Sequence, residues 1–527
     1  MKRIVPALVI LSLAASVASA APSDIVPQGA PANDWMAALA VRGYLGPTIY
    51  ASDFTGNHLH TRDQFAEILY ASFVDDLIVG RVAKDPITAP LAYEAVRFLR
   101  PELLARNVDY DELIAKLHTK SFGATGTLQP EVRIKQDGDT PSGTRLIYRG
   151  VVGGEVARNI SLVVSASNWA QDARRPFYND YGSQGFNAFN EAYLRYDGAN
   201  GLDIRVGRMS EHWGPGMRGA TLVSDNVPPF DELRVAFPFS LGRIFGKNWH
   251  YTQFASTFND YGGRSYFEGR RVEYAFSNHW NFQFEEAFKA NYSGSLAATP
   301  VPFLIFKSFD LDTIDTKYNY NTNLGLSYTA NPNTRVYGQL FGDDFKSPLG
   351  GHKLFGLSLG NKISDTPRRI GYLIGGTHQA GGTAFTLEYA FADPTSNIFK
   401  NDNATWERGR ADYIGMPNGP NTTELSGRIA QKYGPNLTVA AEYRDRQRHD
   451  NSFPAPTSRY FSLSGDYKLS HRETVGATLH EYWQDPFPFQ PGDPGYPPPQ
   501  KYMPFSQANP GTKMRTHEVD LTYKVTF

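Results

Sequence analysis

The chain has 527 residues, a formal net charge of −1 and no cysteine. The near-neutral charge gives no electrostatic footprint for a nucleic acid, and the lack of cysteine excludes disulfides, a thiolate nucleophile and cysteine metal ligands. The length suits two or three ordinary domains, or one large barrel with a small domain. Beyond the N-terminal segment no run approaches 18 apolar residues, which excludes a helical membrane protein.

Residues 1–20 have the layout of a secretory signal peptide. A basic start, Met1–Arg3, precedes an apolar run from Ile4 to Val17 and the small residues Ala18-Ser19-Ala20. Cleavage is expected after Ala20. The apolar run is too short for a spanning helix, and no cysteine follows the cleavage site, so no N-terminal lipid anchor is expected. The mature chain is therefore predicted to be exported.

Residues 21–122 are predicted to form a small helical domain on the periplasmic side. Thr61-Arg62-Asp63-Gln64 has the pattern of a capping box. The apolar residues that follow it at helical spacing are Phe65, Ile68, Leu69 and Phe73. Asn33 or Asp34 is expected to cap an earlier helix, and segments 91–104 and 111–117 complete the bundle.

Part of this domain resembles a single S-layer-homology unit. The resemblance is carried by Asp34-Trp35 through Gly43 and by residues 61–66, and it implies binding to a cell-wall polymer. The alternative is a helical plug or periplasmic cap held by its own core. His58 and His60 lack further ligands at metal spacing, so no metal site is predicted there.

From residue 123 to residue 527 the hydrophobic period changes to two, which is the spacing of a strand with two different faces. The clearest alternating segments are 192–196, 202–206, 280–285, 324–328, 385–391, 437–444 and 461–468. About seventeen or eighteen such segments can be drawn. An open sheet of that size would leave two hazardous edges, which closure removes. The predicted fold is mainly β, a transmembrane antiparallel β-barrel of about 18 strands.

The segment from His517 to Phe527 supports this fold. Val519, Leu521, Tyr523, Val525 and Phe527 fall on one face, and polar residues fall on the other. About ten residues is the length that a tilted crossing of a bilayer requires. The aromatic ending resembles the C-terminal insertion signal of bacterial outer-membrane barrels. The alternative is an edge strand of a soluble sandwich.

The connections alternate in length, as extracellular loops and periplasmic turns do. Counting back from the C-terminus, the long connections are 485–513, 447–457 and 392–420, and the short ones between them are 470–472 and 433–435. The alternation then slips, because the turn-like segment 329–333 lands on the loop side of the count. We therefore expect the number of strands drawn between residues 335 and 380 to be wrong by one, either one too few or one too many.

The densest unusual segment runs from Gly207 to Phe230. A strand that ends in Gly-Arg is followed by Trp213-Gly214-Pro215-Gly216, which cannot continue a strand, and later by Asn226-Val227-Pro228-Pro229-Phe230. This pattern resembles the Wzi capsule-assembly family. The resemblance implies a Gram-negative outer-membrane barrel with a helical periplasmic part, which acts as a lectin and retains capsular polysaccharide at the surface.

Candidate glycan-binding residues lie in two loops. They are Arg208, Glu211, His212, Trp213 and Arg218 in the first, and Trp406, Arg408, Arg410 and Tyr413 in the loop 392–420. Aromatic rings can stack on sugars, and arginines can hydrogen-bond hydroxyls or pair with acidic groups. The alternative for Trp213 is a structural loop packed inside the barrel, which would also line the lumen. The alternative for the second loop is an ordinary solvated loop.

The predicted function is non-catalytic binding or anchoring of capsular or other surface polysaccharide, with outer-membrane lipid as a further partner and no nucleic acid, cofactor or metal. The alternative is a porin-like diffusion channel for sugars or small solutes. The expected inward-facing charges are Arg195, Asp203, Arg205, Glu388, Arg444, Asp466 and Lys468. Their mixed signs do not indicate an ion-selective pore.

An outer-membrane enzyme is disfavoured. The segment 356–360 matches the Gly-x-Ser-x-Gly pattern of serine hydrolases, but it lies in an alternating stretch with no helix after it. Glu285 and Glu286 are adjacent in an expected strand, so they face opposite sides and do not form an acid–base pair.

Overall fold

The computed structural model describes residues 25–26, 30–55, 60–135, 143–167, 191–217, 219–224, 229–240, 249–260, 263–277, 279–290, 318–331, 333–343, 353–354, 357–358, 370–392, 407–408, 412–413, 415, 422–448, 457–484 and 514–527. The expected signal peptide, residues 1–20, lies outside them. None of the helices in these ranges is long and apolar enough to cross a membrane.

Between residues 31 and 117 the described part of the chain forms seven helices. They are α2 (Pro31–Val41), α3 (Ser52–Thr55), α4 (Arg62–Phe73), α5 (Asp76–Ala83), α6 (Thr88–Phe98), α7 (Arg100–Ala105) and α8 (Tyr110–Leu117). The predicted capping box is confirmed, because the Gln64 N–H donates to Thr61 Oγ1 at 3.1 Å and the Thr61 N–H donates to Gln64 Oε1 at 2.9 Å. The expected cap at Asn33 or Asp34 is wrong. Helix α2 begins earlier, at Pro31, whose fixed φ suits the first helical position.

The strands of the barrel follow. They are β1 (Phe122–Lys135), β2 (Gly143–Ala157), β3 (Ile160–Ser167), β4 (Glu191–Asp197), β5 (Asp203–Met209), β6 (Phe230–Phe239), β7 (Trp249–Asp260), β8 (Gly263–Ala275), β9 (Trp280–Ala290), β10 (Tyr318–Asn331), β11 (Thr334–Asp343), β14 (Ile370–Ala380), β15 (Thr383–Ala392), β18 (Thr422–Tyr433), β19 (Leu437–Arg448), β20 (Thr457–Lys468), β21 (Glu473–Gln484) and β22 (Met514–Thr526). A short 3-10 helix, η3 (Ala199–Gly201), joins β4 to β5.

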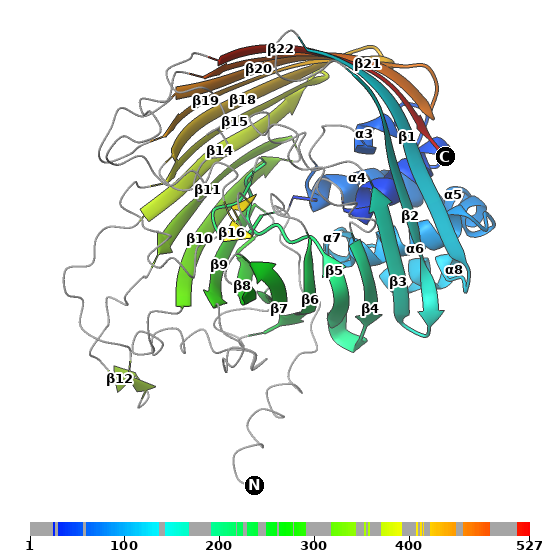
Figure 1. The fold of residues 1–527 in the computed structure, drawn as a ribbon. Coiled ribbons are helices and arrows are strands. Elements are labelled where there is room, and N and C mark those ends of the chain that lie inside the picture. The colour runs from blue at the N-terminus through cyan, green and yellow to red at the C-terminus, as the bar shows by residue number, and fades with distance from the viewer. Residues whose placement is uncertain are drawn as a thin grey trace, which may run out of the picture.

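These strands form one closed 18-stranded sheet. Each pairs antiparallel with the next along the chain, and β1 pairs with β22, which removes both sheet edges. Figure 1 shows the resulting barrel. Two short hairpins form separate sheets, β12 (Lys353–Leu354) with β13 (Leu357–Ser358), and β16 (Glu407–Arg408) with β17 (Asp412–Tyr413). The predicted antiparallel barrel of about 18 strands is confirmed.

Burial along the strands is reversed relative to a soluble protein. Leu194 and Leu521 are 42% and 45% exposed on the outer face, whereas their chain neighbours Arg195 and Asp520 are 5% and 7% exposed and face the lumen. Apolar side chains outside and polar side chains inside are the pattern of a barrel that is surrounded by lipid. Aromatic pairs such as Trp280 with Tyr328, 4.6 Å between ring centres, lie at the edge of this apolar surface.

The slip in the predicted loop alternation is resolved by β14, which the sequence did not reveal. Strand β14 puts Leu373 on the lumen side, where it is 2% exposed, and two of its other lumen positions are Gly371 and Gly375. An apolar residue and glycines on the inner face erase the alternation by which a membrane strand is recognised. The two-residue turn Gly381-Gly382, with φ of +55° and +85°, then joins β14 to β15.

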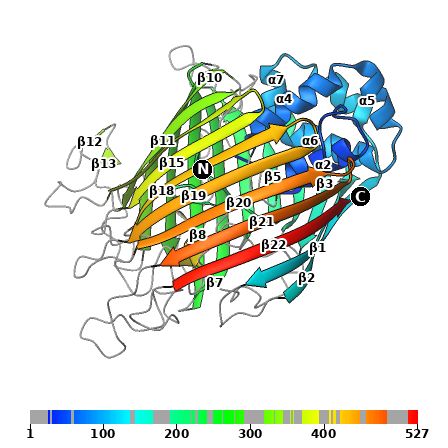
Figure 2. The same ribbon diagram turned by 90° about the horizontal axis from the view of Figure 1, so that it is seen from above.

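The helices lie at the end of the barrel that carries the short turns and the C-terminus (Figure 2). We call this the short-turn end and the opposite end the long-loop end. Helix α6 packs on β1 and β2. One apolar core joins the helical residues to four side chains of the barrel wall, Val151, Val163, Tyr193 and Met209. The helical segment is therefore packed into the short-turn end of the lumen.

Candidate functional site

The loop between β5 and β6 folds into the lumen, and we call residues 210–224 the crossing loop. Its path depends on Gly214, whose φ of +122° lies in the region that favours glycine. A Cβ on Gly214 would collide with the side-chain amide of Gln339 on β11. The crossing loop therefore passes through the barrel and comes close to β11.

Trp213 anchors the crossing loop. Its side chain is 1% exposed, and its indole N–H donates to Glu211 Oε2 at 2.6 Å. Glu211 in turn forms an ion pair with Arg234 at 3.0 Å. The Trp213 ring meets Phe254 edge-on with 5.0 Å between centres, and the Arg271 guanidinium lies 5.7 Å from the ring centre. The ring is thus enclosed by protein, which favours a structural role of Trp213 over direct contact with sugar.

The crossing loop is tied to strands on the far side of the lumen. Two side chains donate hydrogen bonds to its backbone: Gln339 Nε2 to the Trp213 carbonyl at 3.3 Å, and Arg335 Nη2 to the Pro215 carbonyl at 3.2 Å. Glu388 Oε1 accepts a third from the Met217 N–H at 2.6 Å. Arg335 and Gln339 belong to β11, and Glu388 belongs to β15. A loop that leaves β5 and bonds to β15 spans the interior of the barrel, and it narrows the lumen.

The other first-loop candidates have different surroundings. His212 is buried, and its Nε2 lies 3.1 Å from the Gly216 carbonyl within the crossing loop. Arg208 faces outward from β5 and forms two hydrogen bonds with Asp231 on β6, at 2.8 and 2.9 Å. The structure therefore brings Glu211, His212 and Trp213 together in the lumen but places Arg208 on the outer face.

Gly415 of the second candidate loop contacts the crossing loop. Ser224 Oγ donates to the Gly415 carbonyl at 2.6 Å, so this loop meets the crossing loop. The backbones of Arg408 and Tyr413 lie in the β16–β17 hairpin. Arg218, Trp406 and Arg410 lie outside the described residues. The predicted glycan contacts of the second loop therefore remain predictions.

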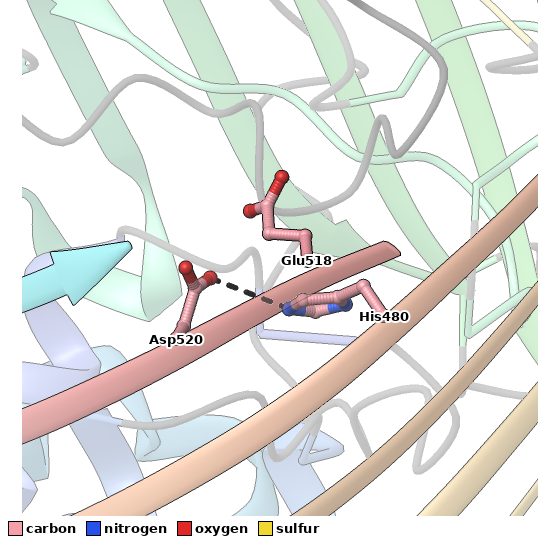
Figure 3. Close-up of side chains that lie close together, drawn as sticks. All are labelled: His480, Glu518 and Asp520. Atoms are coloured by element: carbon pink, nitrogen blue, oxygen red, sulfur yellow. Dashed lines mark ion pairs between the residues drawn. The ribbon is translucent and has the colours of Figure 1, made fainter. Parts of the chain in front are cut away.

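A charged network on the lumen wall was not identified from the sequence. Figure 3 shows His480, Glu518 and Asp520 close together, with His480 Nε2 3.4 Å from Asp520 Oδ2. Their ligand atoms lie within 4.8 Å of one another, which is a spacing that a metal ion could use. However, Arg133 Nε lies 2.9 Å from Glu518 Oε1 and 3.1 Å from Asp520 Oδ1. The guanidinium already supplies the positive charge that the two carboxylates require.

Aromatic rings extend this network along the wall. Tyr460 and Tyr482 are 5.1 Å apart between ring centres, and the His480 ring stacks on both at 5.9 and 6.2 Å. The Arg444 guanidinium lies 4.5 Å from the Tyr460 ring centre. Rings beside arginines and carboxylates are the groups that hold sugars, through stacking and charge-assisted hydrogen bonds. They come from strands β19 to β22, far from both loops that the sequence singled out.

At the short-turn end, ion pairs hold the helices to the barrel. Asp34 on α2 accepts two hydrogen bonds from Arg149 Nε on β2, at 2.9 and 2.7 Å, and burial raises the pKa of Asp34 despite this partner. Asp53 lies 2.8 Å from Lys468. Burial alone would raise the pKa of Asp53, but Lys432 and Lys468 outweigh it and lower that pKa.

These contacts bear on the S-layer resemblance. Asp34 and Trp35, which carry part of it, are 2% and 1% exposed and face the barrel or the helical core. His60 is half-buried, with its Nε2 2.7 Å from the Asp53 carbonyl, while His58 lies outside the described residues. This placement favours the alternative, a helical plug held by its own core.

Comparison with known proteins includes a full-length similarity to a solved structure. The solved structure is Wzi of Escherichia coli, described as an outer-membrane protein involved in group 1 capsule assembly and a carbohydrate-binding β-barrel. It is 14% identical, with a TM-score of 0.50 over 95% of this chain and 99% of its own. Two Pseudomonas aeruginosa barrels, OccK8 (OprE) and OccK1 (OpdK), are each 9% identical, with TM-scores of 0.42 and 0.41 over 77% of this chain and 98% of theirs.

A search of curated protein sequences finds no match. The family model described as capsule assembly protein Wzi matches residues 121–484. This range runs from the start of β1 to the end of β21 and includes the crossing loop. Because the match covers well over half of the chain, the chain belongs to the Wzi capsule-assembly family of outer-membrane proteins.

Proposed function

We propose that this protein binds capsular or other surface polysaccharide at its long-loop end and retains it at the cell surface, without catalysis. In this proposal the long loops face the exterior and the helices face the periplasm. The observation that carries it is that the lumen is obstructed at two levels. The crossing loop spans the interior, and the helical core packs against the lumen wall at the short-turn end.

The chemistry of the wall supports a receptor for sugars. Tyr460, His480 and Tyr482 supply ring faces, while Arg133, Glu518 and their neighbours supply hydrogen-bonding groups. Each sugar contact of this kind is weak. A repeating polymer meets many of them at once, so the affinity rises by multivalency without any single tight site.

The charges of the lumen argue against the channel alternative. Arg195 and Arg205 both pair with Asp203, at 3.1 and 2.8 Å, instead of forming a ladder of one sign. Paired charges of both signs give no ion selectivity. Solute diffusion would also require a path past the crossing loop and past the apolar core that joins the helices to the wall.

The second loop is tested by substitution of its four candidates. The variant Trp406→Ala/Arg408→Ala/Arg410→Ala/Tyr413→Ala should shift polysaccharide from the cell-bound to the shed fraction, while the barrel keeps its heat-dependent gel mobility. Arg472→Ala, an exposed arginine at the short-turn end, is the control and should leave the cell-bound fraction unchanged. Equal cell-bound fractions in the quadruple variant and the parent would remove this loop from the binding surface.

Loss of the whole chain tests the function itself. A strain without it should release most of its capsular polymer into the medium, with the polymer unchanged in repeat structure and length. Retention at the parental level would contradict the proposal. A change in polymer length or linkage would point instead to an enzyme.

A further inference from the structure

The outer face of β19 to β22 changes character toward the long-loop end. Leu463 and Leu521 point outward and are exposed, as expected in lipid. Outward positions on a strand repeat every two residues. Farther along the same strands they are occupied by Arg459, Trp483 and Arg515. We call these three residues the arginine row.

The arginine row is set by strand register. Arg459 lies directly opposite Trp483, and Trp483 lies directly opposite Arg515. Because neighbouring strands are about 4.8 Å apart, the two arginines are about 10 Å apart across the tryptophan. The Arg515 guanidinium lies 5.8 Å from the Trp483 ring centre. Two cations therefore flank one aromatic ring on the same outer face.

The height of the row can be worked out from the strands. Twelve residues separate Arg515 from Phe527 at the short-turn end, which is about 40 Å along a strand. A tilt of about 45° reduces this to a height of about 28 Å. The apolar band of such a barrel is about 25 Å tall. The arginine row thus lies just above the hydrocarbon, at the level of the lipid headgroups.

Both guanidiniums keep donors for a ligand. Arg459 and Arg515 are 56% and 60% exposed, and their carboxylate neighbours Asp445 and Glu481 are no closer than 3.7 and 3.8 Å. In the part of the chain that the structure describes, neither guanidinium makes a hydrogen bond. Exposed pairs at such distances contribute about 0–1 kcal/mol. Arg208 at the other side of the barrel differs, because Asp231 holds it through two short hydrogen bonds.

The remaining charges near the row do not block it. Glu481 lies opposite His517, one outward position nearer the middle of the membrane, and its Oε1 is 3.5 Å from His517 Nδ1. Asp445 lies opposite Arg459, on the side away from Trp483. The side of the row that faces the long loops carries no charged outward residue in the described parts of β19 to β22.

We propose that the arginine row binds the phosphate groups of a lipid headgroup in the outer leaflet. Arginine presents a planar fork of donors that matches phosphate oxygens, and tryptophan favours the boundary between hydrocarbon and water. A spacing of about 10 Å allows the two arginines to grip one phosphate or two on the same headgroup. The proposal rests on the orientation given above but not on polysaccharide binding.

Native mass spectrometry of the full chain in detergent tests this site, with diphosphorylated lipid A as the probe. The parent protein should retain the lipid, and Arg459→Gln/Arg515→Gln should bind it at least tenfold more weakly. Arg208→Gln, which removes an outward arginine already held by a carboxylate, is the matched control and should bind as the parent does. Heat-dependent gel mobility confirms that each variant is folded.

Competition separates the possible ligands. Dephosphorylated lipid A should bind as weakly to the parent as lipid A binds to the double variant, and millimolar inorganic phosphate should not displace the lipid. Equal lipid A binding by the parent and the double variant would overturn the proposal. Binding of dephosphorylated lipid A to the parent as tight as that of lipid A would also overturn it. Displacement of lipid A by soluble acidic polysaccharide would overturn it too, and would assign the row to the polymer. Unchanged polymer retention by the double variant would leave the proposed function intact.

Discussion

The tightest structural test concerns Trp213, the anchor of the crossing loop. The variant Trp213→Ala removes a side chain that is 1% exposed and packs on Phe254. Truncation of a buried tryptophan costs about 3–5 kcal/mol. The hydrogen bond to Glu211 is lost as well, which leaves that carboxylate with Arg234 as its ion-pair partner. We expect the free energy of unfolding to fall by at least about 3 kcal/mol.

Equilibrium unfolding in urea, followed by gel mobility in lipid vesicles, measures this loss. Trp213→Phe is the companion variant, because it keeps an aromatic ring against Phe254 but cannot donate to Glu211. It should cost about 1–3 kcal/mol, the usual effect of leaving a buried acceptor without its donor. A Trp213→Ala variant within 1 kcal/mol of the parent would refute the anchoring role. Loss of polymer by a fully stable Trp213→Phe variant would show instead that the indole contacts sugar.

Three further predictions concern the helical segment and the crossing loop. Burial holds the pKa of His60 below its ordinary 6.5, so the folded state keeps it neutral while the unfolded state takes up a proton. The free energy of unfolding of the helices should therefore fall as pH drops below about 6.5, by up to about 1.4 kcal/mol per pH unit. Hydrogen exchange at pH 5 and 7 measures this slope, and His60→Gln should flatten it. An unchanged slope in that variant would exclude His60 as its source. Lys468→Met leaves Asp53 buried with Lys432 at 3.5 Å as its ion-pair partner, and it should destabilise the helices by about 3 kcal/mol. Limited proteolysis measures this loss, and the double variant Asp53→Asn/Lys468→Met should recover part of it. A double variant no more stable than the single one would contradict the pairing of Lys468 with Asp53. Glu388→Gln weakens the hydrogen bond to the Met217 N–H, so it should raise the hydrogen-exchange rate of the crossing loop without affecting that of the helices. An equal rise in exchange rate across the whole chain would mean that Glu388 stabilises the barrel as a whole.

The barrel could be predicted from sequence because each typical strand repeats one simple rule. Leu194 beside Arg195, and Leu521 beside Asp520, show the alternation of lipid-facing and lumen-facing side chains directly. Strand β14 was not recognised because its lumen face carries Leu373 and glycines, and the crossing loop passes so close that a Cβ on Gly216 would meet Leu373. The local sequence cannot show that a lumen position is filled by a distant loop.

The candidate site was predicted only in part for the same reason. The Trp-Gly-Pro-Gly segment identified a special loop, but its inward path depends on Gln339 and Glu388, more than 100 residues away. The network of His480, Glu518 and Arg133 joins strands from both ends of the chain, since closure makes β1 and β22 neighbours. The parity of β21 and β22 would place His480 and Glu518 in the lumen, but their contact with Arg133 follows only from the register.

Electrical conductance of the purified full chain in a planar lipid bilayer tests the obstructed lumen most directly. With the crossing loop bonded to β15 and the helical core packed against the wall at the short-turn end, the protein should insert without producing steady current steps. Steps of the size given by open general porins would contradict this account, because they would require a continuous aqueous path where we place the crossing loop and the helices.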